Sequence, residues 1–104
     1  MKKKEKIRVL CLHGKRQTAD LFATRLERLV SKGRKAGIDF VFVDAPHEFD
    51  VDVAAGQTAA VRTWWRESGS VEEELRAVQL VEKYWWRNAP LHGVLAFSQV
   101  RLNN

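Results

Sequence analysis

Three short apolar runs divide this chain. They are IRVLCL at 7–12, FVFVD at 40–44 and GVLAF at 93–97. None of them alternates between apolar and polar residues, as a strand with one solvated face would. Near-continuous apolar runs of this length are typical of strands covered on both faces, as in a parallel sheet. The pattern therefore predicts three buried parallel strands.

The stretch between the first two runs has the helical period and predicts one helix over 19–36. Asp20 near its start and Lys35 near its end suit the helix dipole. Gly37 follows as a plausible stop. The apolar positions share one broad face, which we expect to be buried: Leu21, Phe22, Leu26, Leu29 and Val30.

A second helix is predicted over 71–86, before the third run. Ser70 and Glu73 form an S-x-x-E capping box at its start. Asn88, Ala89 and Pro90 end it. Its predicted apolar face is Leu75, Val78, Leu80, Val81 and Trp85.

The predicted order is β-α-β-loop-α-β. Strands that alternate with helices indicate an α/β fold with a parallel sheet and right-handed crossovers. The 104 residues suffice for one small domain. Residues 45–69 form a long connection without strong periodicity, and such loops are usually functional or mobile.

Charge is unevenly distributed. The net charge is +5, with the cations concentrated in residues 1–35 and five acids but no bases in residues 36–60. A basic segment invites a nucleic-acid interpretation. A solvated tail and the exposed face of the first helix explain the same charges, so we expect no nucleic-acid partner.

Compartment and cofactors follow from what the sequence lacks. The apolar part of the N-terminus is too short for a signal peptide and is interrupted by Arg8. No apolar run is long enough to span a membrane. Cys11 lies in a predicted strand and is interpreted as a buried, inert thiol. No His/Cys spacing indicates zinc. We expect a cytoplasmic chain, also admitted to the nucleus, without metal or cofactor.

A His-Gly turn follows the first predicted strand directly. It reads Leu12-His13-Gly14-Lys15-Arg16-Gln17. Ligands and reacting groups of α/β sheets gather at the carboxyl ends of strands. Backbone N–H groups in such a turn can stabilise an oxyanion. Taken alone the turn is a weak signal, and it is no phosphate-binding loop.

A serine follows the third predicted strand. Ala96-Phe97-Ser98-Gln99-Val100 stands where α/β-hydrolases carry the G-x-S-x-G nucleophile elbow. Val100 departs from that pattern, because its branched side chain would crowd the strand-to-helix turn, an overpacking that costs about 1–3 kcal/mol. Taken alone the serine motif is a weak signal, because a serine after an apolar strand is more often a turn residue.

Four stretches in one order make the pattern specific. VLCLHGKRQT, FVFVDAPHEF, RTWW and GVLAFSQ follow one another with suitable spacing. In this the chain resembles the FSH family of small serine hydrolases, which includes the ovarian-cancer-associated hydrolase, within the α/β-hydrolase superfamily. The resemblance covers about residues 6–99. It corresponds to the N-terminal portion of such a hydrolase, and it implies a partial α/β-hydrolase fold.

The resemblance implies roles for individual residues. Ser98 falls on the nucleophile, and the backbone N–H groups of Gln99 and Lys15 fall on the oxyanion hole. The segment with His47 resembles one that lines the site, as does the His13-Gly14 turn. His92 stands where the family usually has an acid, so no role transfers to it. Trp64 and Trp65 match a family loop, which implies that they line an acyl pocket in the complete enzyme; the alternative is ordinary packing.

The triad acid and histidine follow the serine in α/β-hydrolases, and residues 99–104 contain neither. We therefore expect a hydrolase chain truncated after the nucleophile strand, without turnover of its own. Its expected parts are a basic tail at 1–6, the N-terminal part of the hydrolase domain at 7–99 and a divergent tail at 100–104. The substrate implied for the complete family fold is a small carboxylic ester or thioester.

Other interpretations stay open. His13 or His47 could substitute as a base, although each is better explained as a turn residue. The chain could be a non-catalytic binding fragment or a basic anion-binding module. It could also be a half-domain that does not fold alone. Aromatic surface left uncovered would favour self-association.

Overall fold

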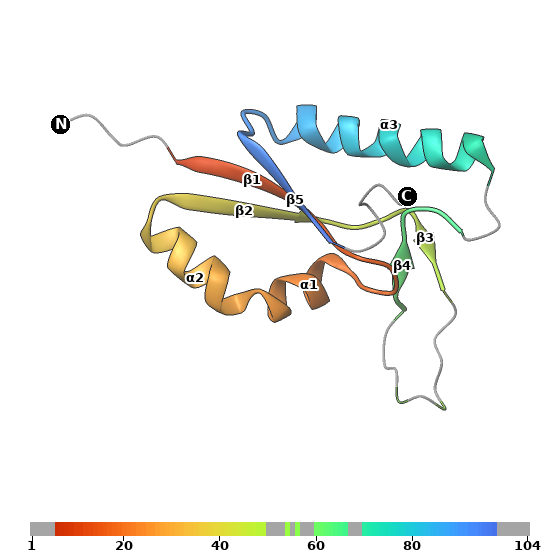
Figure 1. Ribbon diagram of the computed structural model, residues 1–104, viewed down its shortest axis with the longest axis horizontal. Coiled ribbons are helices and arrows are strands. Elements are labelled where there is room, and N and C mark those ends of the chain that lie inside the picture. Colours follow the sequence, from red (N-terminus) through yellow and green to blue (C-terminus); the bar gives the residue numbers. More distant parts are fainter. Residues whose placement is uncertain (1–5, 50–53, 55, 57–59, 67–69, 98–104) are drawn as a thin grey trace.

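The centre of the fold is a parallel sheet of three strands, seen in a computed structural model that describes residues 6–49, 54, 56, 60–66 and 70–97 (Figure 1). The strands are β1 (Ile7–Leu12), β2 (Ile38–Val43) and β5 (Gly93–Ala96). Their order is β2-β1-β5, with both neighbours parallel to β1. The expected partial α/β-hydrolase fold is thus confirmed at the level of a parallel sheet with crossover helices.

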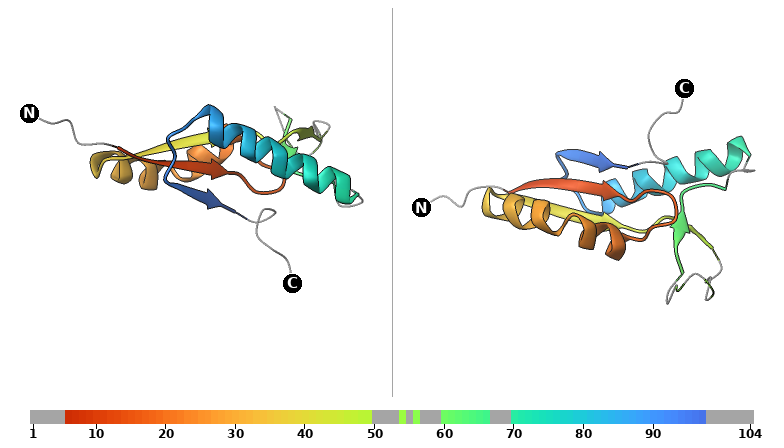
Figure 2. Two further views of the ribbon diagram at one scale, coloured as in Figure 1. Left: turned by 90° about the horizontal axis from the view of Figure 1, so that it is seen from above. Right: turned by 60° about the horizontal axis from the view of Figure 1, so that its bottom comes forward.

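Helices cover the two faces of the sheet (Figures 1 and 2). The short helices α1 (Ala19–Arg25) and α2 (Glu27–Lys35) lie on one face, and the long helix α3 (Val71–Arg87) lies on the other. The central strand β1 therefore lies between layers, which explains its lack of alternation, whereas the edge strand β5 keeps Val94 51% exposed. The strand predicted at 40–44 begins two residues earlier than its pattern indicated.

The prediction of a single helix over 19–36 is wrong in one respect, because this stretch forms two helices. Leu26 separates them with φ −98° and ψ 15°. Hydrogen bonds still run through the junction, from Leu26 N–H to the Phe22 carbonyl and from Val30 N–H to the Leu26 carbonyl. The break is a local change of direction, and no glycine or proline marks it in the sequence.

Two of the three helices, α1 and α3, begin with side-chain caps, whereas α2 has none. The Ser70 hydroxyl accepts the N–H of Glu73 at 3.3 Å, as the predicted capping box requires. The Thr18 hydroxyl accepts the N–H of Leu21 at 3.1 Å at the start of α1. Each cap satisfies an N–H group that has no partner inside its helix.

The main core lies between the sheet and α3. Leu10 and Leu12 of β1 are buried there with Val43 of β2, and Ala77 of α3 joins them. Four of the predicted apolar helix positions are exposed instead of buried, which corrects the expected faces. They are Leu21, Leu29, Leu75 and Val78. Each predicted face is broader than the strip of sheet that its helix covers.

A small hairpin occupies part of the predicted loop at 45–69. The strands β3 (His47–Glu48) and β4 (Arg62–Thr63) pair in antiparallel fashion. Phe49 N–H donates to the Val61 carbonyl and extends the pairing. Arg62 also bridges to Gln17, so the hairpin is attached to the turn that follows β1.

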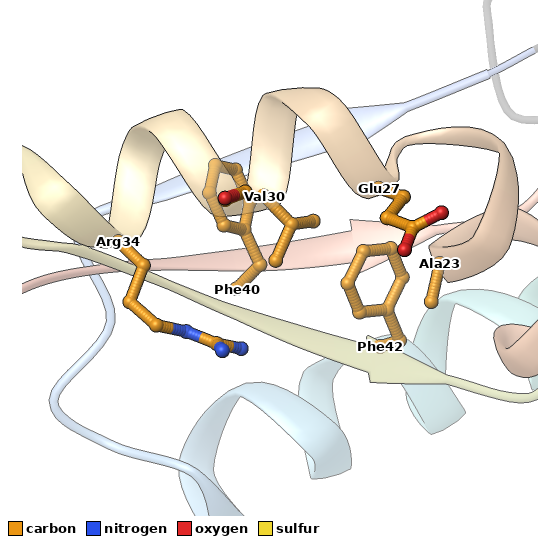
Figure 3. Close-up of a pocket in the computed structure, with 7 residues that line it drawn as sticks. Ala23, Glu27, Val30, Arg34, Phe40 and Phe42 are labelled. Carbon is orange, nitrogen blue, oxygen red and sulfur yellow. The ribbon is translucent and has the colours of Figure 1, made fainter.

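An open pocket of about 440 Å³ lies beside β2 on the α1–α2 face (Figure 3). Phe40 and Phe42 line it from the strand, and Glu27 and Arg34 line it from α2. Gly33 lets α2 approach Phe40, because a Cβ at this position would lie 2.5 Å from the ring. In the part of the chain that the structure describes, no helix is long and apolar enough to cross a membrane.

Candidate functional site

The carboxyl ends of all three parallel strands meet at one edge of the sheet. Leu12 is paired with Val43 on one side and with Ala96 on the other. Phe97 N–H then donates to the Leu12 carbonyl at 3.3 Å. The predicted nucleophile Ser98 and the predicted oxyanion donor Gln99 follow next in the sequence but lie outside the described residues.

The turn after β1 is held by its own side chains and by β4. Gly14 N–H donates to the Gln17 side-chain oxygen at 2.8 Å, and Gln17 is buried. Arg16 N–H donates to the Arg62 carbonyl at 2.9 Å. Lys15, whose N–H is the second predicted oxyanion donor, lies in the sequence between Gly14 and Arg16, which these hydrogen bonds hold in place. Sequence reasoning missed Gln17, although its place in the quoted LHGKRQ stretch could have drawn attention to it.

Arg16 has the left-handed backbone conformation, with φ of 61°. Residues other than glycine, asparagine and aspartate rarely adopt this backbone conformation, which costs them about 1–3 kcal/mol of stability. Its guanidinium carbon lies 4.3 Å from the centre of the Phe49 ring, in a cation–π contact. The contact joins the turn to the β3–β4 hairpin and offsets part of that cost.

His13 lies fully buried beneath the site edge. Its Nε2 accepts the N–H of Ala45 at 3.0 Å, so the proton of the neutral ring is on Nδ1, which donates to the Gly14 carbonyl at 2.7 Å. Burial lowers the pKa of His13 below its ordinary value of 6.5. The structure thus holds this predicted site-lining residue as a neutral ring with both nitrogens engaged.

Trp64 completes this buried contact. Its indole N–H donates to the His13 carbonyl at 2.8 Å, and the two ring centres are 5.4 Å apart. Trp64 is 1% exposed. Trp65, the other predicted pocket residue of this pair, is partly buried against the main core. Both tryptophans therefore pack within the domain, and Trp64 does so against the residue that begins the turn after β1.

The loop after β2 ties several elements together. The Asp44 carboxylate accepts the N–H of Ala19 at the start of α1, at 2.8 Å. The Asp44 carbonyl accepts the Tyr84 hydroxyl of α3 at 2.9 Å, and burial raises the pKa of that phenol. The Arg62 guanidinium donates to the Ala45 carbonyl at 2.8 Å. These hydrogen bonds attach the loop to α1, α3 and β4.

His47 is paired with an acid on α3. Its Nε2 lies 3.1 Å from the Glu73 carboxylate, which also accepts the Arg66 N–H at 3.0 Å. The loop that carries His47 follows β2, and β1 separates β2 from β5. Because neighbouring strands lie about 4.8 Å apart, the ends of β2 and β5 are separated by roughly 10 Å. His47 thus lies on the β2 side of the edge, where its pairing with Glu73 joins the hairpin to α3.

His92 lies at the opposite edge of the sheet, before β5. Its Nδ1 accepts the Arg8 N–H at 3.0 Å, and its own N–H donates to the Arg8 carbonyl at 2.8 Å. Among the described residues, no group of three or more His, Cys, Asp or Glu side chains is arranged to hold a metal ion.

The candidate site is the edge of the sheet where three segments meet. These are the turn after β1, the loop after β2 and the end of β5.

This architecture is that of part of an α/β-hydrolase fold: a parallel sheet with crossover helices, and in the sequence a serine that follows shortly after the last strand. The family model described as Serine hydrolase (FSH1) matches residues 1–99. The chain belongs to this family of serine hydrolases, as its sequence resemblance indicated.

Curated relatives agree with the family assignment. An esterase of Drosophila melanogaster is 36% identical over 91% of this chain and 38% of its own length. An esterase of Drosophila pseudoobscura pseudoobscura is 35% identical, with 91% of this chain and 37% of the relative covered. An esterase of Caenorhabditis elegans is 32% identical over 95% of this chain and 48% of the relative. The chain thus spans less than half the length of these relatives.

Proposed function

We propose that the chain provides the nucleophile and oxyanion-hole half of a serine esterase site. The Ser98 oxygen attacks the acyl carbonyl carbon and gives its proton to a general base. The N–H groups of Lys15 and Gln99 bind the resulting oxyanion. The tetrahedral species expels the alcohol or thiol, which takes up the proton. Water then attacks the acyl-enzyme and releases the carboxylic acid, returning the proton to Ser98.

The pairing of Leu12 with Ala96 is the observation that carries this proposal. It brings the end of β5 beside the turn at His13–Gly14, and the Phe97–Leu12 hydrogen bond continues that approach by one residue. A nucleophile just after Phe97 would therefore begin next to Lys15. Nucleophile and oxyanion donor must lie within reach of one carbonyl group for acyl transfer.

We propose further that the general base comes from polypeptide outside these 104 residues. The chain has three histidines. His13 has both ring nitrogens engaged, and His92 accepts a backbone N–H at the far edge of the sheet. His47 is held by Glu73 on the β2 side. None of them has the position of a base for a nucleophile that follows β5.

The substrate class follows from the relatives, whose printed names are esterases. We assign this site a small carboxylic ester or thioester with an apolar acyl group. Trp65, which is partly buried against the main core, is the aromatic residue that we assign to this acyl pocket. We also assign His47 and Gly14 to the lining of the site, whereas Trp64 is 1% exposed and supports the site from beneath through its hydrogen bond to the His13 carbonyl.

A fluorophosphonate probe tests the proposal, because it reacts with an activated serine. Intact mass is measured for the 104-residue chain, for Ser98→Ala and for Ser31→Ala, an exposed serine on α2. With the base outside the chain, we expect slow labelling that Ser98→Ala abolishes and Ser31→Ala leaves unchanged. Labelling that survives Ser98→Ala would exclude Ser98 as the nucleophile.

A source of the base is tested in the same assay. Added imidazole supplies a small general base in solution and should accelerate Ser98 labelling. If labelling is instead fast without imidazole and is lost in His47→Gln, the base lies within this chain. That outcome would overturn the external base and leave the nucleophile assignment intact.

Anion binding is the second candidate function, favoured by the exposed cations of α1 and α2. Five of them are exposed and have no ion pair within the described residues: Arg25, Arg28, Lys32, Arg34 and Lys35. Retention on a polyanion column tests it. Retention that disappears on removal of residues 2–6 belongs to the basic tail, whereas retention lost in Arg28→Gln belongs to the helix.

A further inference from the structure

Gly14 precedes the oxyanion donor proposed at Lys15, and side chains hold the peptide groups on both sides of this glycine. The Gly14 N–H donates to the Gln17 side-chain oxygen at 2.8 Å. The Gly14 carbonyl accepts the Nδ1 proton of His13 at 2.7 Å. Glycine has the widest conformational freedom of all residues. The two hydrogen bonds therefore fix a residue that would otherwise let the turn rotate.

The orientation of the Gly14 carbonyl decides the orientation of the Lys15 N–H. The two groups belong to one planar trans peptide unit, in which the C=O and the N–H point in opposite directions. The Gly14 carbonyl points to the buried His13 ring, so the Lys15 N–H points away from that ring. This direction is kept only while Gly14 keeps its backbone dihedral angles.

Gln17 holds Gly14 from a fixed base. The Gln17 carbonyl accepts the Arg62 N–H at 2.8 Å, and these two residues form a β-bridge. Gln17 is only 7% exposed, so its side chain is confined as well as hydrogen-bonded. The Gln17 side chain therefore transmits the position of β4 to the turn after β1.

The hydrogen bond from Gly14 to Gln17 closes a ring of contacts. From Gln17 the ring continues to Arg62, whose guanidinium donates to the Ala45 carbonyl at 2.8 Å. The Ala45 N–H donates to His13 Nε2 at 3.0 Å, and His13 Nδ1 donates back to Gly14. Removal of the Gln17 side-chain oxygen would open this ring directly beside the oxyanion donor.

The backbone strain at Arg16 agrees with a turn that must be held. Arg16 has φ of 61°, and its N–H donates to the Arg62 carbonyl at 2.9 Å. Strained backbone persists only where its surroundings over-determine it, and it clusters at active sites. The bond from Arg16 to Arg62 holds one side of Lys15, and the bond from Gly14 to Gln17 holds the other.

We propose that Gln17 is a positioning residue of the oxyanion hole. Its side-chain oxygen holds Gly14, and Gly14 in turn aims the Lys15 N–H at the oxyanion. This role rests on the proposed function, because it takes Lys15 as an oxyanion donor for Ser98. A donor stabilises the oxyanion only at hydrogen-bond distance. Loss of the Gln17 oxygen should therefore slow bond formation without weakening the initial binding of a probe.

Fluorophosphonate labelling of Ser98 with added imidazole tests this role, and intact mass measures it. The dependence of the rate on probe concentration separates the maximal labelling rate from the half-saturating concentration. Gln17→Met keeps the length of the side chain but lacks the amide oxygen. We expect its maximal rate to fall about tenfold, less than the 10²–10³ for removal of a whole donor, with an unchanged half-saturating concentration. Gln79→Met, at an exposed glutamine of α3, should label like the wild type.

Two further measurements separate positioning from loss of the fold. In Gln17→Met the Gly14 N–H should exchange with solvent faster by NMR, whereas the N–H groups of α3 should keep their wild-type exchange rates. Gly33→Ala, whose Cβ would crowd Phe40, is the control for lower stability and should leave the maximal rate per folded chain unchanged. If circular dichroism shows that Gln17→Met does not fold, Gln17→Asn replaces it, because its shorter side chain does not span the same distance.

The wild-type chain separates this role from the proposed function. If Ser98 of the wild-type chain is not labelled, both are wrong. If Ser98 is labelled and Gln17→Met changes neither the maximal rate nor the Gly14 exchange, only the role of Gln17 is wrong. A loss that appears in the half-saturating concentration, or an equal loss in Gly33→Ala, would also overturn the role of Gln17 and leave the nucleophile assignment intact.

Discussion

The ring of His13 and the backbone of Ala45 join the ends of two neighbouring parallel strands through a hydrogen bond of 3.0 Å. The two residues are 32 positions apart in the sequence. His13 immediately follows β1, and Ala45 lies two residues after the end of β2. Because Trp64 binds the His13 carbonyl, the same histidine also anchors the segment after β4. His13 therefore holds the candidate site edge in shape.

Stability should fall as the pH is lowered, because of His13. Burial lowers the pKa of His13 below the 6.5 of an accessible imidazole. As the pH falls below 6.5, His13 therefore binds a proton in the unfolded chain before it does so in the folded chain. The His13 contribution to the free energy of unfolding is complete above that pH and is lost as pH falls through the folded-state pKa. We expect a lower urea midpoint at about pH 5.5 than at about pH 7.5.

Substitution at His13 isolates this contribution. In His13→Gln the amide oxygen can accept the Ala45 N–H but does not titrate. The fall in urea midpoint should become shallower in this variant and persist in His47→Gln. An unchanged fall in His13→Gln would assign the pH dependence to other groups.

Trp64→Phe should destabilise the chain through one lost hydrogen bond. The His13 carbonyl would lose a buried donor, at a cost of about 1–3 kcal/mol. Trp86→Phe is the matched control, because Trp86 is 70% exposed, and we expect a change within about 0.5 kcal/mol. Urea unfolding followed by circular dichroism measures both. Equal effects of the two substitutions would contradict the role of the Trp64 indole N–H.

Gly33→Ala should destabilise the packing of α2 on the sheet. Its Cβ would lie 2.5 Å from the Phe40 ring, and such overpacking costs about 1–3 kcal/mol. Gly93→Ala, where a Cβ meets nothing within 4 Å, is the control. The double variant Gly33→Ala with Phe40→Leu should regain part of the loss. If Gly33→Ala alone raised the thermal midpoint, the close approach of α2 to Phe40 would be wrong.

Cys11 should resist thiol reagents in the folded chain. It is fully buried, and burial raises the pKa of its thiol to about 11. The thiolate is the reactive species, so iodoacetamide at about pH 8 should leave the native chain unmodified and add once to the denatured chain. Mass spectrometry counts the adducts. Rapid modification of the native chain would show that β1 opens readily.

The sequence by itself determined the strands, the crossover helices and the edge where the site residues gather. These features depend on local patterns: apolar runs for covered strands, the 3.6-residue period for helices, and the capping box at Ser70. The site edge followed from the rule that parallel strands end at one edge. Ser98 and Gln99 remain predictions from the family pattern, because they lie outside the described residues.

Only the tertiary structure decided which apolar residues are buried and how the site edge is held. Periodicity marks the apolar side of α3, but the position of the helix over β1 and β2 decides that Ala77 is buried and Val78 is exposed. The Trp64–His13 bond spans 51 positions, and no local pattern encodes such a contact. Burial and long-range hydrogen bonds depend on neighbours that the folded chain brings together, and a linear sequence does not display those neighbours.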